Sequence, residues 1–324
     1  MKYRKLKGIS VSLAGGLGNQ LFQLAAGMTH SGTLPTYLNF DFGSPRTNQH
    51  GEPEIMSFKL PDNVYLRKGV KADSLSSKLV NALLRSSLDL SFKAVLLTRA
   101  LNPLVSFCLS IKLKKLVIAK TGRGVGFFSG FSPKPGDLLI GYFQSFVWAS
   151  NQVVFEKLMQ IEPVLHDSSY FHLVELAQKI RPVIVHVRLG DYRFEPKIGI
   201  LDKDYYVAAI EEIFSNSDSK EIWVFSDEPW TALEMFSEFK NYKIRLITEL
   251  QNSPAHTFQL MRHGSAFIIA NSTFSWWAAF LRFDQSARVI APEPWFSNAE
   301  SPHMLIPHGW VKLARPNDKE DYRT

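Results

Sequence analysis

The chain has 324 residues, of which 45% are hydrophobic, and a formal net charge of +7 at pH 7. This length exceeds what one hydrophobic core usually organises, so two domains are expected. The single cysteine, Cys108, excludes an internal disulfide framework and a cysteine-based zinc site, and it fits a reducing compartment. No run approaches the roughly 18 to 20 uninterrupted apolar residues that span a bilayer, so we expect a soluble or peripherally attached protein.

Residues 8–14 are predicted to form the first strand, and residues 15–28 a glycine-rich turn that opens a helix. The turn is neither a Walker loop nor a dinucleotide fingerprint, because no Gly-Lys-Ser/Thr follows and Leu21 stands where the third glycine belongs. Backbone N–H groups at such a turn can face a ligand, and neutral amides suit phosphate oxygens or sugar hydroxyls. The candidate contacts are Gly16, Gly18, Asn19 and Gln20, and the alternative is a plain strand-to-helix turn.

From residue 40 to about 165 the sequence is poorly periodic, with short apolar pieces such as residues 137–144. Residues 156–163 read as a helix stopped by Pro163. Because the pattern becomes regular beyond this point, we predict an N-terminal domain over residues 1–168 and a C-terminal domain over residues 169–324.

The positive charge is concentrated in residues 67–134, where thirteen Lys or Arg face two Asp, a local balance of +11 that leaves −4 for the rest. Within it, residues 96–115 mix apolar and cationic side chains as an interfacial helix does, although Pro103 interrupts them. One hypothesis is reversible binding to an anionic membrane, centred on Lys112, Lys114 and Lys115. The alternative is a solvated helix, and nothing resembles a nucleic-acid-binding motif.

The C-terminal half alternates strands with helices, which predicts βαβ units and a parallel sheet. The predicted strands cover residues 182–188, 221–225, 266–270 and 288–292. The predicted helices cover residues 169–179, 204–214 with Asp204 as N-cap, 229–239, 254–263 and 271–281.

The strand that begins at Pro182 ends in His186, Arg188 and Asp191. A planar Arg fork pairs with phosphate oxygens, and an Asp can orient that fork or take a proton. These residues therefore suit an anionic phosphate donor. A surface salt bridge beside a core histidine is the alternative.

Two further polar groups follow predicted strands, Ser226 with Asp227, and Asn271 with Ser272 and Thr273. Ligands of open α/β sheets bind at the carboxyl ends of parallel strands, so all three clusters are expected at one edge. Asp227 can accept paired N–H donors from a base such as guanine, while Ser272 and Thr273 can offer donors to phosphates at a helix start. Trp276 and Trp277 are predicted to be core of that helix.

These segments also carry a family resemblance. Residues 15–23 (GGLGNQLFQ), 186–192 (HVRLGDY), 225–227 (FSD) and 271–277 (NSTFSWW) resemble the ordered motifs of glycosyltransferase family 11, the bacterial α-1,2-fucosyltransferases. Trp295-Phe296, Ile306-Pro307 and Trp310 are similar to the family's C-terminal signature. Leu189 stands where the family usually has a second arginine, and Ala278 where glycine is common.

The resemblance implies an α/β protein of GT-B type, with two Rossmann-like domains whose parallel sheets face each other across a cleft. It implies transfer of L-fucose from GDP-β-L-fucose to a galactose hydroxyl of a glycan, with inversion and no obligatory metal or other cofactor. The donor is expected on the C-terminal domain and the acceptor on the N-terminal one. A cytoplasmic protein of carbohydrate and O-antigen synthesis is expected, with possible contact to the inner face of the membrane.

On this reading Arg188 neutralises the departing GDP. Asp191 is the candidate base, or it orients Arg188 and proton removal is late. The predicted donor-binding residues are His186, Ser226, Asp227, Asn271, Ser272, Thr273, Gly16, Gly18, Asn19 and Gln20.

Two other classes of protein remain open on the sequence. A metal-dependent transferase of another nucleotide sugar could use Asp202 and Asp204 as a carboxylate pair. A noncatalytic glycan-binding protein would bind glycans without transfer.

Overall fold

The computed structural model describes residues 7–40, 43–67, 74–88, 91–113, 116–165, 167–215, 221–237 and 239–315. The chain divides into two compact units, which we call unit 1 (residues 1–162 and 302–305) and unit 2 (residues 163–301 and 306–324). The division falls between Glu162 and Pro163, slightly before the predicted boundary after residue 168. Residues 302–305 join unit 1 because their backbone pairs with it. Phe127 donates its N–H to the carbonyl of His303 at 2.9 Å, and Phe146 donates to that of Met304 at 2.9 Å.

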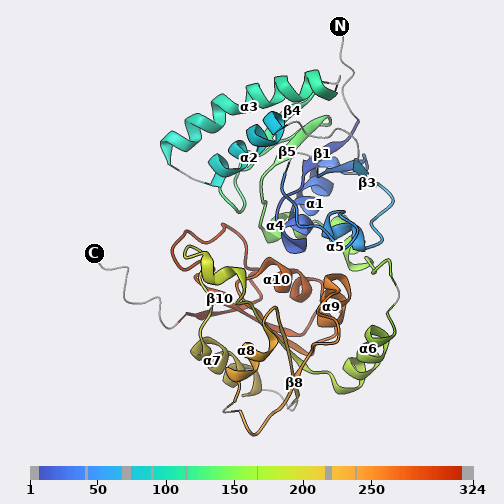
Figure 1. Cartoon of the computed structure of the whole chain (residues 1–324), viewed down its shortest axis with the longest axis vertical. Coiled ribbons are helices and arrows are strands. Elements are labelled where there is room, and N and C mark those ends of the chain that lie inside the picture. Colours follow the sequence, from blue (N-terminus) through green and yellow to red (C-terminus); the bar gives the residue numbers. More distant parts are fainter. Residues whose placement is uncertain are drawn as a thin grey trace, which may run out of the picture. The chain divides into compact units, whose positions relative to one another are not determined.

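Unit 1 is built on a five-stranded parallel sheet with the order β3-β2-β1-β5-β4 (Figure 1). The strands are β1 (Ile9–Ser12), β2 (Thr36–Asn39), β3 (Val64–Arg67), β4 (Ile118–Thr121) and β5 (Asp137–Ile140). The helices are α1 (Leu17–Ser31), η1 (Glu54–Ser57), α2 (Ser74–Leu88), α3 (Phe92–Leu113), α4 (Phe146–Ala149) and α5 (Gln152–Met159). The stretch that looks irregular in sequence therefore holds regular elements, because its strands have only four residues each, too few to show a period.

Helix α3 continues through Pro103 and lies beside α2 and β4 (Figure 1). Within the described residues, its segment Lys93–Ile111 is long and apolar enough to cross a membrane, with 19 residues and a mean hydropathy of 1.6, and only 22% of it is buried. The sequence has no uninterrupted apolar run of this length, but the Thr, Arg, Asn and Ser residues that interrupt this one do not make the helix polar on average, so the sequence analysis missed it.

Unit 2 is built on a six-stranded parallel sheet with the order β11-β10-β9-β6-β7-β8. The strands are β6 (Val183–Val187), β7 (Glu221–Ser226), β8 (Lys243–Leu246), β9 (Ala266–Ile268), β10 (Arg288–Glu293) and β11 (Val311–Ala314). The helices are α6 (Ser168–Ile180), η2 (Asp191–Phe194), α7 (Lys203–Phe214), α8 (Pro229–Glu234), α9 (Pro254–Met261) and α10 (Thr273–Phe280). The α/β class with two parallel sheets is confirmed.

The two faces of β6 pack against different helices of unit 2. Val183, Val185 and Val187 share a buried cluster with α7 side chains such as Tyr205 and Ile210. On the opposite face the ring of His186 lies 5.9 Å from that of Phe274 on α10. The fully buried Trp276 and Trp277 confirm that these tryptophans belong to the core.

Several predicted boundaries need correction. Helix α7 starts at Lys203, and its N-cap is Asp202 rather than Asp204, because the Asp202 carboxylate accepts the N–H of Tyr205 at 3.1 Å. Helix α8 ends at Glu234 rather than residue 239. Strands β8 and β11 were not predicted, and both are only partly buried edge strands without a clear apolar pattern.

Candidate functional site

The three polar clusters of the sequence meet at one edge of the unit 2 sheet. β6 lies between β7 and β9, with Val187 opposite Ser226 and Val185 opposite Ile268. All three strands run parallel, so their carboxyl ends share one edge, where ligands of open α/β sheets bind. The residues placed there are His186, Arg188, Asp191, Ser226, Asp227, Asn271, Ser272 and Thr273.

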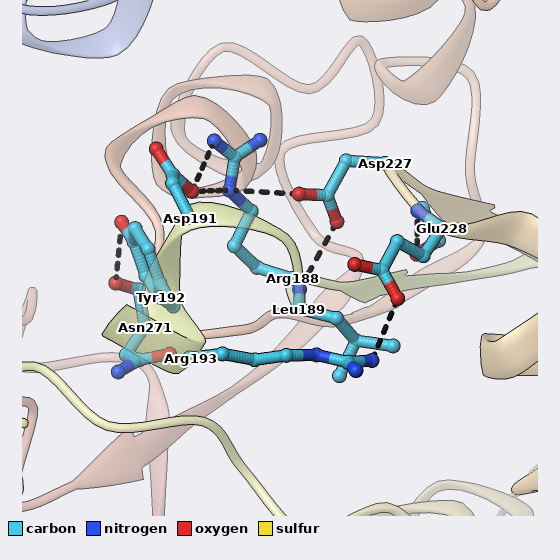
Figure 2. Close-up of polar contacts among 9 residues, drawn as sticks. Arg188, Leu189, Asp191, Tyr192, Arg193, Asp227, Glu228 and Asn271 are labelled. Atoms are coloured by element: carbon cyan, nitrogen blue, oxygen red, sulfur yellow. Dashed lines mark hydrogen bonds and ion pairs between the residues drawn. The ribbon is translucent and has the colours of Figure 1, made fainter. Parts of the chain in front are cut away.

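Arg188 is held from two sides by carboxylates (Figure 2). Its Nη2 and Nε donate to Oδ1 of Asp191 at 2.7 and 3.1 Å. Its Nε also lies 3.3 Å from Oδ2 of Asp227. The Tyr192 ring lies 5.3 Å from the guanidinium carbon. The fork is therefore fixed before any ligand binds, and Nη1 has no partner among the described residues.

Asp227 is tied to the turn after β6 as well as to Arg188. Its Oδ1 accepts the backbone N–H of Leu189 at 3.0 Å. A Cβ added to Gly190 would lie 2.5 Å from Asp227 Oδ2, so a larger residue would require the carboxylate or the turn to shift. In this structure both Asp227 oxygens serve Arg188 and the turn, and the contact of Asp227 with a base stays a prediction.

Two site residues escaped the sequence interpretation. Arg193 Nη2 donates to Glu228 Oε2 at 2.6 Å, which links η2 to the residue after Asp227 (Figure 2). The Ser226 hydroxyl accepts the N–H of Glu228 at 3.0 Å, so Ser226 shapes this turn. The signal was present in sequence, because Arg193 and Glu228 each follow a selected motif directly, but only the loop geometry shows that they pair.

The cluster carries two arginines, Arg188 and Arg193, against three carboxylates, Asp191, Asp227 and Glu228, which leaves one excess negative charge. Burial acts to lower the pKa of Arg188, but the carboxylates of Asp227 and Asp191 outweigh it and raise that pKa above its ordinary value. The guanidinium therefore stays charged. An anionic ligand can gain from it only by replacing one of its carboxylate partners or by using Nη1.

His186 is buried beneath this edge. Burial lowers its pKa to about 3, and the nearby charge of Arg188 acts in the same direction. Its Nδ1 is buried without a hydrogen-bond partner among the described residues. The imidazole is therefore neutral near pH 7 and adds no charge to the site.

Asn271, after β9, is connected to the segment that follows β6. Its Nδ2 donates to the carbonyls of Ile198 and Gly199 at 3.1 and 2.9 Å. The Tyr192 hydroxyl donates to the backbone carbonyl of Asn271 at 3.5 Å. The side-chain Oδ1 is buried without a partner among the described residues. Ser272 is the N-cap of α10 but makes no capping hydrogen bond through its side chain, and Thr273 is the first helical residue.

The glycine-rich turn of unit 1 has mostly internal roles. Gln20 is fully buried, and its Nε2 donates to the carbonyls of Gly15 and Arg46, both at 2.9 Å, while its Oε1 accepts the N–H of Ile55 at 2.9 Å. Asn19 Oδ1 accepts from Gln144 Nε2 at 2.9 Å. Of the two amides, only Asn19 keeps a side-chain nitrogen without a partner within the described residues.

The start of α1 is occupied by a carboxylate of unit 1 itself. Gly16 is its N-cap, Gly18 is buried within it, and the N–H of Leu17 donates to Glu54 Oε2 at 2.6 Å. Glu54 is buried, so its charge interacts strongly with the positive end of the helix. A donor phosphate would have to displace Glu54 from this position.

Among the described residues, no group of three or more His, Cys, Asp and Glu side chains is arranged to hold a metal ion. Asp202 of the proposed carboxylate pair serves as the α7 N-cap.

The fold is similar to that of solved glycosyltransferases of GT-B type. Over 91% of this chain and 97% of the other, the structure resembles NodZ α-1,6-fucosyltransferase soaked with GDP-fucose, with a TM-score of 0.51 and 12% identity. Over 97% of this chain and 94% of the other, it resembles the Escherichia coli ADP-heptose LPS heptosyltransferase II, with a TM-score of 0.50 and 11% identity. At these identities the likeness concerns the fold.

Residues 157–314 match the model of glycosyl transferase family 11. An α-1,2-colitosyltransferase of Escherichia coli is 27% identical over 319 residues, 94% of this chain and 98% of that protein. The O-antigen biosynthesis glycosyltransferase WbnK of Escherichia coli is 31% identical over 188 residues, 56% of this chain and 62% of that protein. The predicted resemblance to glycosyltransferase family 11 is thereby confirmed over residues 157–314, the part of the chain that matches the family model.

Proposed function

We propose that this glycosyltransferase moves a 6-deoxy-L-hexose, L-fucose in the first instance, from its GDP-β-sugar to a galactose hydroxyl of a glycan. The observation that carries the proposal is the guanidinium of Arg188, held ready at the edge where β6, β7 and β9 end. The solved relative soaked with GDP-fucose supports the donor class. The colitosyltransferase relative widens it, because colitose is L-fucose without its 3-hydroxyl.

Donor binding is proposed to exchange one partner of Arg188. The Asp191 side chain is 49% exposed and that of Asp227 is 24% exposed, so Asp191 leaves at the lower cost. A phosphate oxygen then takes the Nη2 position that Asp191 held, and a second oxygen meets Nη1. Asp227 keeps Nε in place throughout. This exchange moves one carboxylate off the guanidinium as the diphosphate takes its place.

The same exchange frees Asp191 to act as the base. The acceptor oxygen forms a bond to the anomeric carbon as the bond from that carbon to the β-phosphate oxygen breaks. The electron pair leaves with GDP, the proton of the acceptor hydroxyl passes to Asp191, and the configuration inverts. Arg188, with backbone donors at the start of α10 near Ser272 and Thr273, stabilises the charge that develops on GDP.

Neutral His186 and the unpaired oxygen of Asn271 complete the donor side of this proposal. Because the imidazole is uncharged, it imposes no electrostatic preference on the sugar and can act only through a hydrogen bond or packing. Unit 1 is proposed to contribute the acceptor side, in O-antigen assembly as in the relative named for it. We propose that the reaction takes place in the cytoplasm and needs no obligatory metal.

A donor screen tests this function. The protein is incubated with a galactoside acceptor and, separately, GDP-β-L-fucose, GDP-colitose, GDP-mannose and UDP-galactose, with and without EDTA. The proposal expects transfer from the GDP-6-deoxy-L-hexoses, undiminished by EDTA, and an α-1,2 linkage by NMR. Transfer only from UDP-galactose, or loss of transfer in EDTA that Mg²⁺ or Mn²⁺ restores, contradicts it. Glycan binding without any transfer points instead to a noncatalytic protein.

A further inference from the structure

The polar side chains of helix α3 face the rest of unit 1. These side chains recur every fourth residue, at Thr98, Asn102, Ser106 and Ser110, and so form one stripe. The Ser106 hydroxyl accepts the N–H of Ala119 at 2.9 Å, and that of Ser110 accepts the N–H of Val117 at 2.9 Å. The Thr121 hydroxyl donates to Asn102 Oδ1 at 2.6 Å. The stripe therefore covers the edge of the sheet, because β4 is the outermost strand on this side.

The opposite stripe of α3 is apolar and exposed. Its large side chains are between 45% and 64% exposed, and they are Leu96, Leu97, Leu104, Phe107 and Ile111. Leu116, just before β4, and Ile118, the first residue of β4, are also exposed next to the helix. Soluble proteins rarely show so many neighbouring large apolar side chains to water, and such a patch marks a surface that contacts something else.

The charge around this apolar stripe is of one sign. Helices α2 and α3 contain no Asp or Glu, and their Lys78, Arg85, Lys93 and Arg99 are all exposed. None of these four cations forms an ion pair within the part of the chain that the structure describes. The larger region from residue 67 to 134 carries +11. The fitting partner is therefore both apolar and anionic.

We propose that unit 1 binds the surface of an anionic phospholipid bilayer through α3, with Leu104, Phe107 and Ile111 inserted among the lipid chains. A second copy of this chain fits the surface less well, because a symmetric contact would bring the same cations face to face. Lys114, Lys115 and the side chain of Lys112, on which the sequence hypothesis centred, lie outside the described residues. The inference is also independent of the proposed donor.

The helix lies along the bilayer surface and does not cross it. Its length and hydropathy suit a membrane span. However, its polar stripe is hydrogen-bonded to its neighbours along its whole length. Ser106 and Ser110 bond to the backbone at and just before β4. The Thr98 hydroxyl lies 2.9 Å from that of Ser86 on α2. To span the membrane, α3 would have to leave the edge of β4 and expose those groups to lipid. An interfacial position keeps all of these contacts.

Vesicle flotation of the full chain tests the binding. We expect binding to vesicles containing phosphatidylglycerol at about 50 mM salt, and release at about 500 mM, because surface charge is screened. Leu104→Gln with Phe107→Gln should weaken partitioning about tenfold or more, because the lost apolar burial is not replaced. Trp230→Gln removes an aromatic from α8 of unit 2 that is more exposed than Phe107, and it should leave partitioning unchanged. Circular dichroism confirms that each variant is folded.

Spin labels test the orientation. In a Cys108→Ser background, the variants Leu97→Cys, Leu104→Cys and Ile111→Cys each carry one nitroxide. Positions 97 and 111 are 14 residues apart, about 21 Å along the helix at about 1.5 Å per residue. The surface position predicts similar shallow depths for all three labels, whereas a span predicts that the label at 104 is deepest. Three results overturn the proposal, namely no flotation at low salt, flotation unaffected by the Gln substitutions, or a lipid-free dimer that those substitutions abolish.

Discussion

Asp227, the residue after β7, holds Arg188, the residue after β6: Asp227 Oδ2 lies 3.3 Å from Arg188 Nε. Asp227 Oδ1 also accepts the N–H of Leu189 at 3.0 Å. One side chain thus fixes both the arginine and the turn that follows it. This relationship makes Asp227 a positioning residue for Arg188, and it can be tested separately from ligand contact.

Asp227→Asn should lower kcat/KM for transfer by about 10–100-fold, the range for loss of a group that orients a functional side chain. The amide keeps the shape but cannot accept from both Arg188 and Leu189 with a full charge. Asp284→Asn breaks a surface ion pair with Arg181 in the same unit and should leave kcat/KM unchanged. Equal kinetics for Asp227→Asn and wild type would show that Arg188 does not need this carboxylate.

Gly190→Ala should reduce transfer strongly while the chain stays folded. The new methyl would lie 2.5 Å from Asp227 Oδ2, so the carboxylate or the turn must move away from Arg188. Gly309→Ala is the matched control, since no atom lies within 4 Å of the Cβ it would add. Steady-state kinetics and thermal melting of both variants check this, and unimpaired transfer by Gly190→Ala would place the catalytic geometry elsewhere.

The alternation of strands and helices in unit 2 is predictable because each buried strand has a strong apolar run, as in residues 183–187, and a polar end. The convergence of His186, Arg188 and Asp191 with the ends of β7 and β9 follows from that topology. The pairings do not. Whether Asp227 meets a ligand or Arg188 depends on the turn at Gly190, which no periodicity encodes, and Arg193 reaches Glu228 only through the short helix η2. In unit 1, four-residue strands and the inward polar stripe of α3 contradict the patterns that sequence interpretation relies on.

The low pKa of His186 predicts an acid-sensitive fold. The buried imidazole is neutral down to a pKa of about 3, whereas in the unfolded chain it takes a proton near pH 6.5. The unfolded state therefore binds more protons between these values, so this residue's contribution to stability is complete above pH 6.5 and declines as the pH falls toward 3. At pH 5 the decline is on the order of 2 kcal/mol, at about 1.4 kcal/mol per pH unit.

His186→Gln should remove this part of the pH dependence. Urea unfolding of both proteins at pH 7 and pH 5 checks the prediction, and the quantity compared is the change in the free energy of unfolding between the two pH values. A wild type that loses no more stability than the variant would mean that His186 is accessible or paired in its charged form.

Glu54→Gln should destabilise unit 1 by about 0.5–2 kcal/mol, because it removes the charged partner of the α1 N-terminus. GDP affinity, measured by calorimetry, should not change, since the donor is assigned to unit 2. Glu156→Gln, on an exposed face of α5, is the control for stability. A marked change in GDP affinity in Glu54→Gln would restore the glycine-rich turn of Gly16 and Gly18 as a donor contact.

A calorimetric comparison of GDP with guanosine shows whether the fork of Arg188 binds the diphosphate of the donor. Arg188→Lys keeps the charge but loses the planar fork, so GDP affinity should fall roughly 10–100-fold while guanosine affinity stays the same. We expect the advantage of GDP over guanosine to shrink by the whole of that factor in the variant. An unchanged advantage, with both ligands weakened equally or neither weakened, would contradict it.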